Sequence, residues 1–244
     1  MPTAYRYALY LAPAGSLREV GQRWLGRCAD TGLPLARSAG ADPREASWTQ
    51  APRRYGLHAT IKAPFRLRAG ATPASLDQAV RRFARTGNAF GLPLQRVRLR
   101  GFLAWCIADD RARQRMNALA GAAVTALDEY RAPPLPDELQ RRQIHLLEPA
   151  QRMMLQRWGY PYAFDTYTFH ITLTGQLAEA DLTAAGRRLD ALDGPALQAP
   201  MPVRAVSLYV EPEPGADFVV ARHYGFDGSC TDGCGVRYLD GECA

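Results

Sequence analysis

Two short stretches of the chain carry the same pattern, a histidine followed two residues later by a threonine. In the first stretch His58 precedes Thr60, and in the second His170 precedes Thr172. Side chains of a β-strand alternate between its two faces, so each histidine shares a face with its threonine. The apolar residues between and beside them fall on the opposite face. Each stretch therefore predicts a strand with one side for a core and one side that carries His/Thr chemistry.

A matched pair of histidines suits a reaction in which one proton is removed and another is delivered. Imidazole titrates near neutral pH, so one ring can act as base while the other, protonated, acts as acid. The threonine hydroxyls can donate hydrogen bonds to phosphate oxygens as charge develops on them. Hydrolysis of a cyclic phosphate has these demands, because water attacks phosphorus and a ribose oxygen leaves with a proton. The similarity of the two motifs leaves open which histidine is the base.

Two further side chains join the predicted phosphate- and substrate-binding set. Lys62, the only lysine of the chain, follows Thr60 on the same face of the first motif strand and would add a positive charge. Tyr10 lies in a predicted strand over residues 5–12 and is a candidate substrate contact. No acidic residue or cysteine occurs on either motif strand at the spacing of metal ligands, so neither a metal nor another cofactor is predicted.

A structural role is the alternative interpretation for each histidine. One His-x-Thr pattern on a strand is usually a packing feature, and it is the second copy that favours function. The chain has four histidines in all. The other two, His145 and His223, fall near the end of a helical stretch and at the end of a terminal strand, and neither is assigned to catalysis.

The elements that must position the motifs follow from hydrophobic periodicity and turn residues. Ser16 and Glu19 have the spacing of a capping box at the start of a helix. Thr72 followed by Pro73 predicts another helix start. In chain order the sequence predicts strand 5–12, a helix from 16, a long loop over 32–54 that could form a lid, the first motif strand, helix 72–87, strands 94–99 and 102–108, helix 109–130, a helical stretch toward 158, the second motif strand, helix 181–192, and strands 203–210 and 218–224.

This order predicts the fold class. The first half runs strand, helix, motif strand, helix, strand, and the same order begins again after Gly101 with one strand added. We expect an α+β fold of two pseudo-twofold-related lobes, each with an antiparallel sheet and helices, over residues 1–100 and 102–226. The active-site cleft would lie between the lobes, within a single domain of residues 1–226. Residues 227–244 are predicted to form a flexible Gly/Cys-rich tail.

Composition indicates an ordinary globular protein. With 244 residues, 47% hydrophobic and 22% charged, the chain can bury a sizeable core. No apolar run approaches the ~20 residues of a membrane helix, and the first residues lack the features of a signal peptide. A cytoplasmic protein without a membrane partner is therefore predicted. The net charge of +6 favours anionic ligands. Arginines scattered among carboxylates nevertheless indicate a solvated basic surface more than a nucleic-acid groove.

The cysteines near the end of the chain are Cys230, Cys234 and Cys243. Their spacing matches no zinc motif, and a structural zinc usually needs a fourth ligand. Exposed thiols on a flexible tail are the preferred interpretation, with a metal site as the alternative.

The residues around the two motifs resemble the two-histidine (2H) phosphoesterase superfamily. Residues 58–61 and 170–173 both agree with its His-h-Thr-h form, in which h is hydrophobic. Residues 54–65 and 169–175, with the opening segment 6–13, look like an uncharacterised bacterial branch often associated with phosphonate-metabolism genes. The resemblance covers roughly residues 5–226.

The resemblance implies a bilobal α+β fold and a metal-independent phosphodiesterase with His58 and His170 as catalytic residues and Thr60 and Thr172 holding the phosphate. The resemblance does not fix the substrate, and a small cyclic ribose or nucleotide phosphate in phosphonate metabolism is our hypothesis for it. One alternative is an RNA 2′,3′-cyclic phosphodiesterase or RNA ligase-like enzyme that acts on an RNA end. Another is a nucleotide- or RNA-binding module without turnover. No protein partner and no oligomeric state follow from the sequence.

Overall fold

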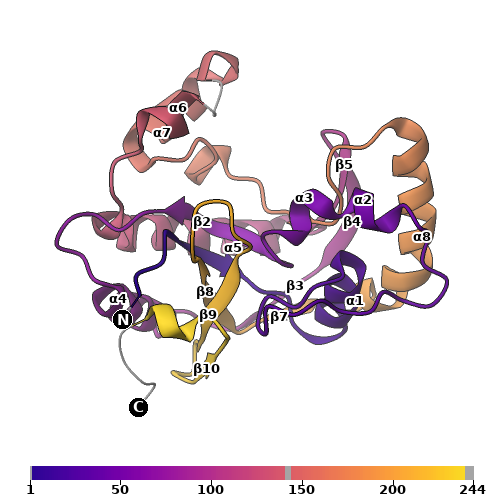
Figure 1. The fold of residues 1–244 in the computed structure, drawn as a ribbon, viewed down its shortest axis with the longest axis horizontal. Helices are drawn as coiled ribbons and strands as arrows, with labels where there is room; N and C mark the ends of the chain where they lie inside the picture. Colours follow the sequence, from indigo (N-terminus) through magenta and orange to yellow (C-terminus); the bar gives the residue numbers. More distant parts are fainter. Residues whose placement is uncertain (1, 141–143, 240–244) are drawn as a thin grey trace.

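One eight-stranded antiparallel sheet organises the computed structural model, which describes residues 2–140 and 144–239 (Figure 1). Its strand order is β10-β9-β8-β1-β2-β6-β5-β4. The bounds are β1 (Arg6–Leu11), β2 (Ala59–Phe65), β4 (Leu94–Leu99), β5 (Phe102–Ile107), β6 (Ile171–Thr172), β8 (Ala205–Glu211), β9 (Val219–Gly225) and β10 (Cys230–Asp232). A separate pair joins β3 (Phe90–Leu92) to β7 (Met201–Val203).

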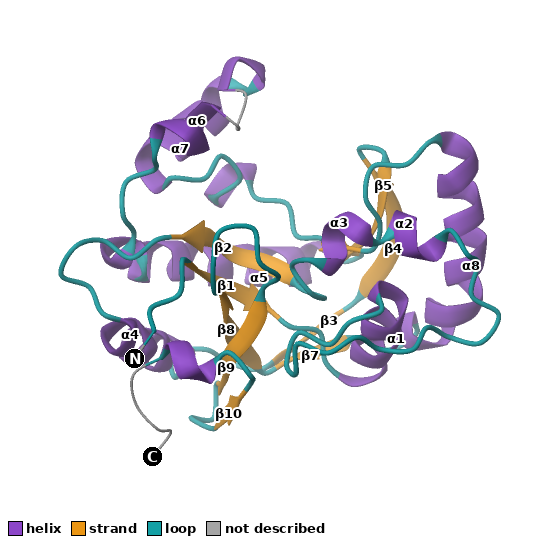
Figure 2. Cartoon of the chain, viewed as in Figure 1, coloured by secondary structure: helices purple, strands orange, loops and turns teal. Residues whose placement is uncertain are grey.

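Helices surround this sheet (Figure 2). Their bounds are α1 (Gly15–Leu25), α2 (Glu45–Trp48), α3 (Gln50–Arg53), α4 (Pro73–Ala84), α5 (Asp110–Ala126), α6 (Pro136–Gln140), α7 (Pro149–Trp158) and α8 (Glu179–Leu197). Short 3₁₀ turns cover Asp128–Tyr130, Ile144–Leu146, Phe164–Thr166 and Val236–Tyr238. In the described ranges, no helix has the length and apolar character that crossing a membrane requires.

The helix starts test the predicted caps. The prediction for α4 is confirmed, because the Thr72 side chain accepts a hydrogen bond from the Ser75 amide and proline occupies the first turn. The prediction for α1 is wrong. That helix begins at Gly15, after Ala14, and has no side-chain cap. Ser16 therefore lies inside the first turn, where its hydroxyl no longer occupies the capping position.

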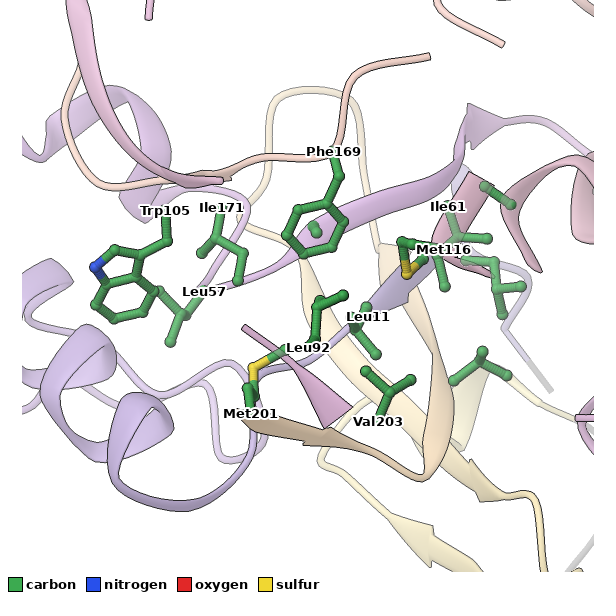
Figure 3. Packing of buried hydrophobic residues seen from close by; sticks show 14 of the residues in the cluster. Leu11, Leu57, Ile61, Leu92, Trp105, Met116, Phe169, Ile171, Met201 and Val203 are labelled. Atoms are coloured by element: carbon green, nitrogen blue, oxygen red, sulfur yellow. The ribbon is translucent and has the colours of Figure 1, made fainter. Parts of the chain in front are cut away.

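The apolar faces of both motif strands are anchored in the main core (Figure 3). Leu57 and Ile61 beside the first motif are 3% exposed, and Phe169 and Ile171 of the second are 4% and 0% exposed. Burial of each such side chain contributes roughly 1.5–3 kcal/mol. The predicted alternation is confirmed for residues 57–61 and 169–173, and this anchoring fixes which face of the sheet carries the histidines.

The α+β class with antiparallel strands is confirmed, but a division into two pseudo-twofold lobes with separate sheets is not shown. Strands from both halves of the chain share one sheet, because β8 pairs with β1 and β6 pairs with β2. The two motif strands are thus direct neighbours in the middle of that sheet. The order of elements along the chain does not show which distant strands form hydrogen bonds with each other. The single sheet therefore could not be predicted from that order.

The predicted flexible tail is instead packed against the fold as far as Leu239, which is 2% exposed. Residues Cys230–Asp232 pair with β9, and the Cys234 amide donates to the Asp30 carbonyl at 2.7 Å. Asp232 also pairs with the fully buried Arg222, whose guanidinium requires a carboxylate partner. Cys243 and the rest of 240–244 lie outside the described residues.

Candidate functional site

Strand pairing brings the two His-x-Thr motifs together. Ala59 lies opposite Ile171 in the antiparallel pair of β2 and β6. Continuing this register by one residue in each direction places His58 opposite Thr172 and Thr60 opposite His170. Ala59 and Ile171 are both buried in the core, so the four motif side chains project from the other face. Each histidine therefore lies across from the threonine of the other motif.

A pocket of ≈ 340 Å³ opens over these residues. His58, His170 and Thr172 line its polar part, and Tyr55 and Phe102 provide aromatic walls. The volume is that of a small-molecule site. None of the described lining residues is an aspartate, glutamate, lysine or arginine. The pocket thus offers hydrogen-bonding groups and stacking surfaces without a fixed charge.

Both histidine rings are held in the same way. Nδ1 of His58 lies 2.9 Å from the Gly56 carbonyl oxygen, and Nδ1 of His170 lies 2.9 Å from the Thr168 carbonyl oxygen. A carbonyl only accepts, so Nδ1 carries the hydrogen in both rings. Nε2 of each neutral ring then keeps its lone pair. Thr60 Oγ1 lies 3.4 Å from Nε2 of His58 and helps to orient it.

Burial lowers the pKa of both histidines. It brings the pKa of His58 to about 4, with a smaller contribution from the nearby His170 ring. Burial also lowers the pKa of His170, and the positive charge of Arg100 acts in the same direction. Both imidazoles are therefore proton acceptors at neutral pH. An anion bound between them would raise both pKa values.

Tyr10 supports His58 from below. Its ring stacks on the imidazole with 3.9 Å between centroids, and the side chain is 1% exposed. This position corrects the predicted substrate contact. Tyr10 is buried beneath the imidazole and is not among the residues that line the pocket. Tyr55, with its ring 6.0 Å from that of His58, lines the pocket instead.

Lys62 lies away from the pocket. Its Nζ donates to the Val124 carbonyl at 3.1 Å and pairs with Asp128 at 3.3 Å. The side chain is 3% exposed, and burial lowers its pKa to about 8. The predicted phosphate contact is corrected: α5 covers this part of β2, so Lys62 joins strand to helix. Strand alternation predicted the wrong face, because a register shift in β2 follows the pair Tyr10–Thr60 and puts Lys62 opposite Leu9 of the main core.

Several described pocket residues were not predicted from the sequence, among them Tyr55, Phe102 and Gln176. Tyr55 precedes the first motif, Phe102 begins β5, and Gln176 follows β6. Proximity to His58 is a signal that could have identified Tyr55. Phe102 has no such signal, since only the pairing of β5 with β6 brings it beside His170, with 5.9 Å between the ring centroids.

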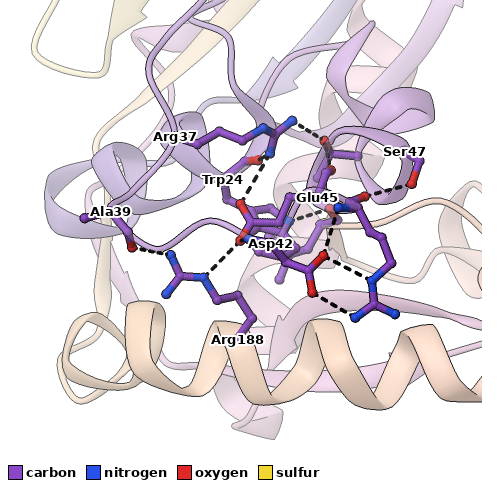
Figure 4. A network of polar contacts seen from close by, with 10 residues as sticks. Trp24, Arg37, Ala39, Asp42, Glu45, Ser47 and Arg188 are labelled. Carbon is purple, nitrogen blue, oxygen red and sulfur yellow. Dashed lines mark hydrogen bonds and ion pairs between the residues drawn. The ribbon is translucent and has the colours of Figure 1, made fainter.

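The predicted lid segment 32–54 is fixed in place at one side of the pocket (Figure 4). Glu45, 1% exposed, accepts a hydrogen bond from Arg188 of α8 at 2.9 Å and lies 3.7 Å from Arg37. Arg37 in turn donates to Thr49 Oγ1 at 2.8 Å. The bond from Arg188 holds α2 against α8, and Ala51 and Pro52 of the following α3 form part of the pocket wall.

The other histidines remain outside the pocket. His145 is exposed in a 3₁₀ turn. His223 lies between Ser207 and Asp30, at 2.6 Å from each, in an arrangement similar to a Ser-His-Asp triad. Ser207 is 1% exposed, however, so its hydroxyl cannot reach a substrate. This cluster joins β8, β9 and the loop after α1.

A family model described as "Protein of unknown function (DUF1045)" matches residues 60–219. A protein from Laribacter hongkongensis (strain HLHK9), named ribose 1,5-bisphosphate phosphokinase PhnN, is 40% identical over 221 residues, covering 89% of this chain and 51% of the relative. A protein of the same name from Janthinobacterium sp. (strain Marseille) is 37% identical over 233 residues, covering 91% of this chain and 51% of the relative. The chain spans about half the length of the curated relatives it matches.

These names correct the predicted activity. Both relatives are named as enzymes, but as kinases, and a kinase transfers a phosphoryl group to its substrate. That reaction differs from the predicted hydrolysis of a cyclic phosphate, and the names contradict the predicted phosphodiesterase and hydrolase. Neither name refers to the two-histidine superfamily, so that resemblance stays a prediction.

Proposed function

This chain belongs to the DUF1045 family, and we propose that it binds a phosphorylated ribose in the pocket between His58 and His170. The observation that carries the proposal is that both motif histidines and Thr172 line one pocket of small-molecule size. In this arrangement Nε2 of each ring and the threonine hydroxyl hold the phosphate. Tyr55 and Phe102 pack against the sugar.

The relatives' names support ribose phosphate as the ligand class. Both relatives are named for ribose 1,5-bisphosphate as their substrate. A kinase also needs a site for the phosphates of its donor, which a P-loop with a Gly-Lys-Ser/Thr end commonly provides. The one lysine of this chain follows Ile61, so the chain has no such motif. We therefore assign the sugar phosphate, and not the phosphoryl donor, to this chain.

The paired motifs also support the predicted relationship to the two-histidine superfamily, as a likeness of site architecture. The register that sets each histidine opposite the other motif's threonine is what such a shared architecture requires. This likeness concerns how a phosphate is held and carries no claim about the reaction.

Protonation should be linked to binding. Both rings have lowered pKa values in the free protein. A phosphate between them stabilises the protonated forms and raises those pKa values. Binding should therefore take up protons, and affinity should increase as the pH falls from 8 to about 6.

Isothermal titration calorimetry with ribose 5-phosphate, ribose 1,5-bisphosphate and unphosphorylated ribose tests the proposal. We expect both phosphates to bind and ribose to bind far more weakly. His58→Gln and His170→Gln should each weaken phosphate binding at least roughly 10-fold, the loss expected for a hydrogen bond to a charged group. His145→Gln is the matched control and should bind as the wild type does. Failure of the wild type to bind either phosphate, or unchanged affinity in both site variants, would overturn the proposal.

A further inference from the structure

The turn between β4 and β5 has an unusual residue at its first position. Leu99 pairs with Phe102, so Arg100 and Gly101 alone form the loop. Their φ angles are 48° and 87°, the left-handed values of a two-residue hairpin turn of type I′. Asn, Asp or Gly is favoured at the first of these positions, because the Cβ of other residues crowds the backbone there. The chain therefore keeps an arginine where the fold alone would favour another residue.

This turn lies beside the pocket. Its second residue, Gly101, accepts a hydrogen bond from the Leu177 amide at 3.0 Å, next to the pocket residue Gln176. Phe102, directly after the turn, lines the pocket and faces the ring of His170. The hairpin is thus fastened to the segment that follows the second motif. Its tip projects from the sheet near α8 in Figure 1.

The Arg100 side chain extends toward the same end of the pocket. Its guanidinium carbon lies 5.8 Å from the centroid of the Tyr162 ring. Its charge also acts on His170, lowering the pKa of that ring. Arg100 therefore lies on the His170 side of the site, with an aromatic face to hold its guanidinium.

Arg100 differs from the other arginines of the hairpin in its charge balance. Arg96 pairs with Asp190 and Asp193, and Arg98 pairs with Glu179. Within residues 2–140 and 144–239 no carboxylate forms an ion pair with Arg100, which is exposed. Among the described residues that line the pocket beside it, none carries a fixed charge. A guanidinium in this position can form two parallel hydrogen bonds to one phosphate.

We propose that Arg100, held by Tyr162, binds the second phosphate of a ribose bisphosphate whose first phosphate lies between His58 and His170. This inference rests on the proposed function and extends it to a residue outside both motifs. Arg100 then sets the preference for a ligand with two phosphates over a ligand with one. The cost of the left-handed arginine is explained by this contact.

The test compares ligand preference in variants of the full chain by calorimetry. Arg100→Asn places a favoured residue in the turn and removes the charge, so thermal unfolding should show a fold at least as stable as the wild type. Its affinity for ribose 1,5-bisphosphate should fall roughly 10–100-fold. Its affinity for ribose 5-phosphate should change by less than about threefold. Arg100→Lys should keep part of the preference, and Arg98→Gln in the same hairpin is the matched control without effect.

Each outcome separates this inference from the proposed function. If the wild type binds ribose phosphates and Arg100→Asn binds the bisphosphate equally well, the role of Arg100 is overturned and the proposed function stands. Equal losses for both ligands would also overturn the assignment to the second phosphate. If the wild type binds neither phosphate, the proposed function and this inference both fail.

Discussion

The two halves of the site carry the same motif in different surroundings. The His58 ring is enclosed by tyrosines, with Tyr10 stacked on it at 3.9 Å and Tyr209 at 6.3 Å between centroids. The His170 ring meets Phe102 at 5.9 Å and lies near the charge of Arg100. The same His-x-Thr pattern therefore produces two different imidazoles, because desolvation and nearby charge come from distant parts of the chain.

This difference gives each histidine its own expected protonation. The pKa of His58 falls to about 4, so its lone pair remains available throughout the neutral range. The pKa of His170 is also lowered, by burial and then by Arg100. An anion that pairs with Arg100 cancels the second cause. We therefore expect His170 to take up the first proton when a phosphate binds.

The largest difference between the halves should appear at the residues that orient the rings. Gly56, whose carbonyl holds His58, has φ of +72°, and a Cβ there would lie 2.6 Å from the Cβ of Ala29. Gly56→Ala should therefore cost about 3 kcal/mol or more through strain and overpacking. Thr168→Ala keeps the carbonyl that holds His170 and changes an exposed side chain, so it should cost less than about 0.5 kcal/mol. Urea unfolding measures both, and equal losses would contradict the comparison.

The pH dependence of stability should come mainly from His58. Its pKa falls from 6.5 to about 4 on folding. The unfolded state binds more protons in this window, so the free energy of unfolding decreases as the pH falls from 6.5 to 4. The full shift corresponds to about 3 kcal/mol, and partial exposure of the ring reduces the expected loss to about 2 kcal/mol.

Urea unfolding at several pH values checks this expectation. His58→Gln should remove most of the decrease between pH 6.5 and 4, because glutamine does not titrate. His170→Gln should remove a smaller part. If both variants kept the full dependence of the wild type, another group would be responsible for it.

The sequence predicted those features that depend on neighbours along the chain. Alternation in residues 57–61 and 169–173 identified the buried and the polar side chains of both motifs. The Thr72 cap and the strands on either side of Arg100–Gly101 also depend on local backbone preferences, and the structure confirms them.

Features that depend on partners distant in the chain could not be predicted from the sequence. A register shift in β2 puts Lys62 opposite Leu9 and off the predicted face, and no local pattern links it to its partner Asp128 after α5. Gly/Asp-rich residues in the tail suggested flexibility, whereas Asp232 is fixed by the buried Arg222. The pocket itself forms only because β2 and β6 become neighbours. Such pairings come from tertiary packing, which overrides local propensity.

Tyr10 and Phe102 provide a smaller test of the same asymmetry. Tyr10→Leu removes the stacked ring, admits water beside His58, and should raise the pKa of His58 by about one unit. Phe102→Leu acts on the other half and should leave the pKa of His58 nearly unchanged. Titration followed by NMR of the imidazole protons measures both. An unchanged pKa of His58 in Tyr10→Leu would show that the rest of the fold keeps it desolvated.

The smallest expected effect distinguishes Arg100 from Lys62 as the cation that acts on the histidines. Arg100→Asn should raise the pKa of His170 by a fraction of a pH unit, because one like charge is removed across partly solvated space. The pKa of His58 should change less. Lys62→Met should alter neither ring, since Asp128 already balances the Lys62 charge and keeps Arg131 as a partner at 2.8 Å afterwards. A shift of His170 in Lys62→Met and none in Arg100→Asn would reverse the assignment. The charge that acts on the site would then come from the first motif strand and not from the β4–β5 turn.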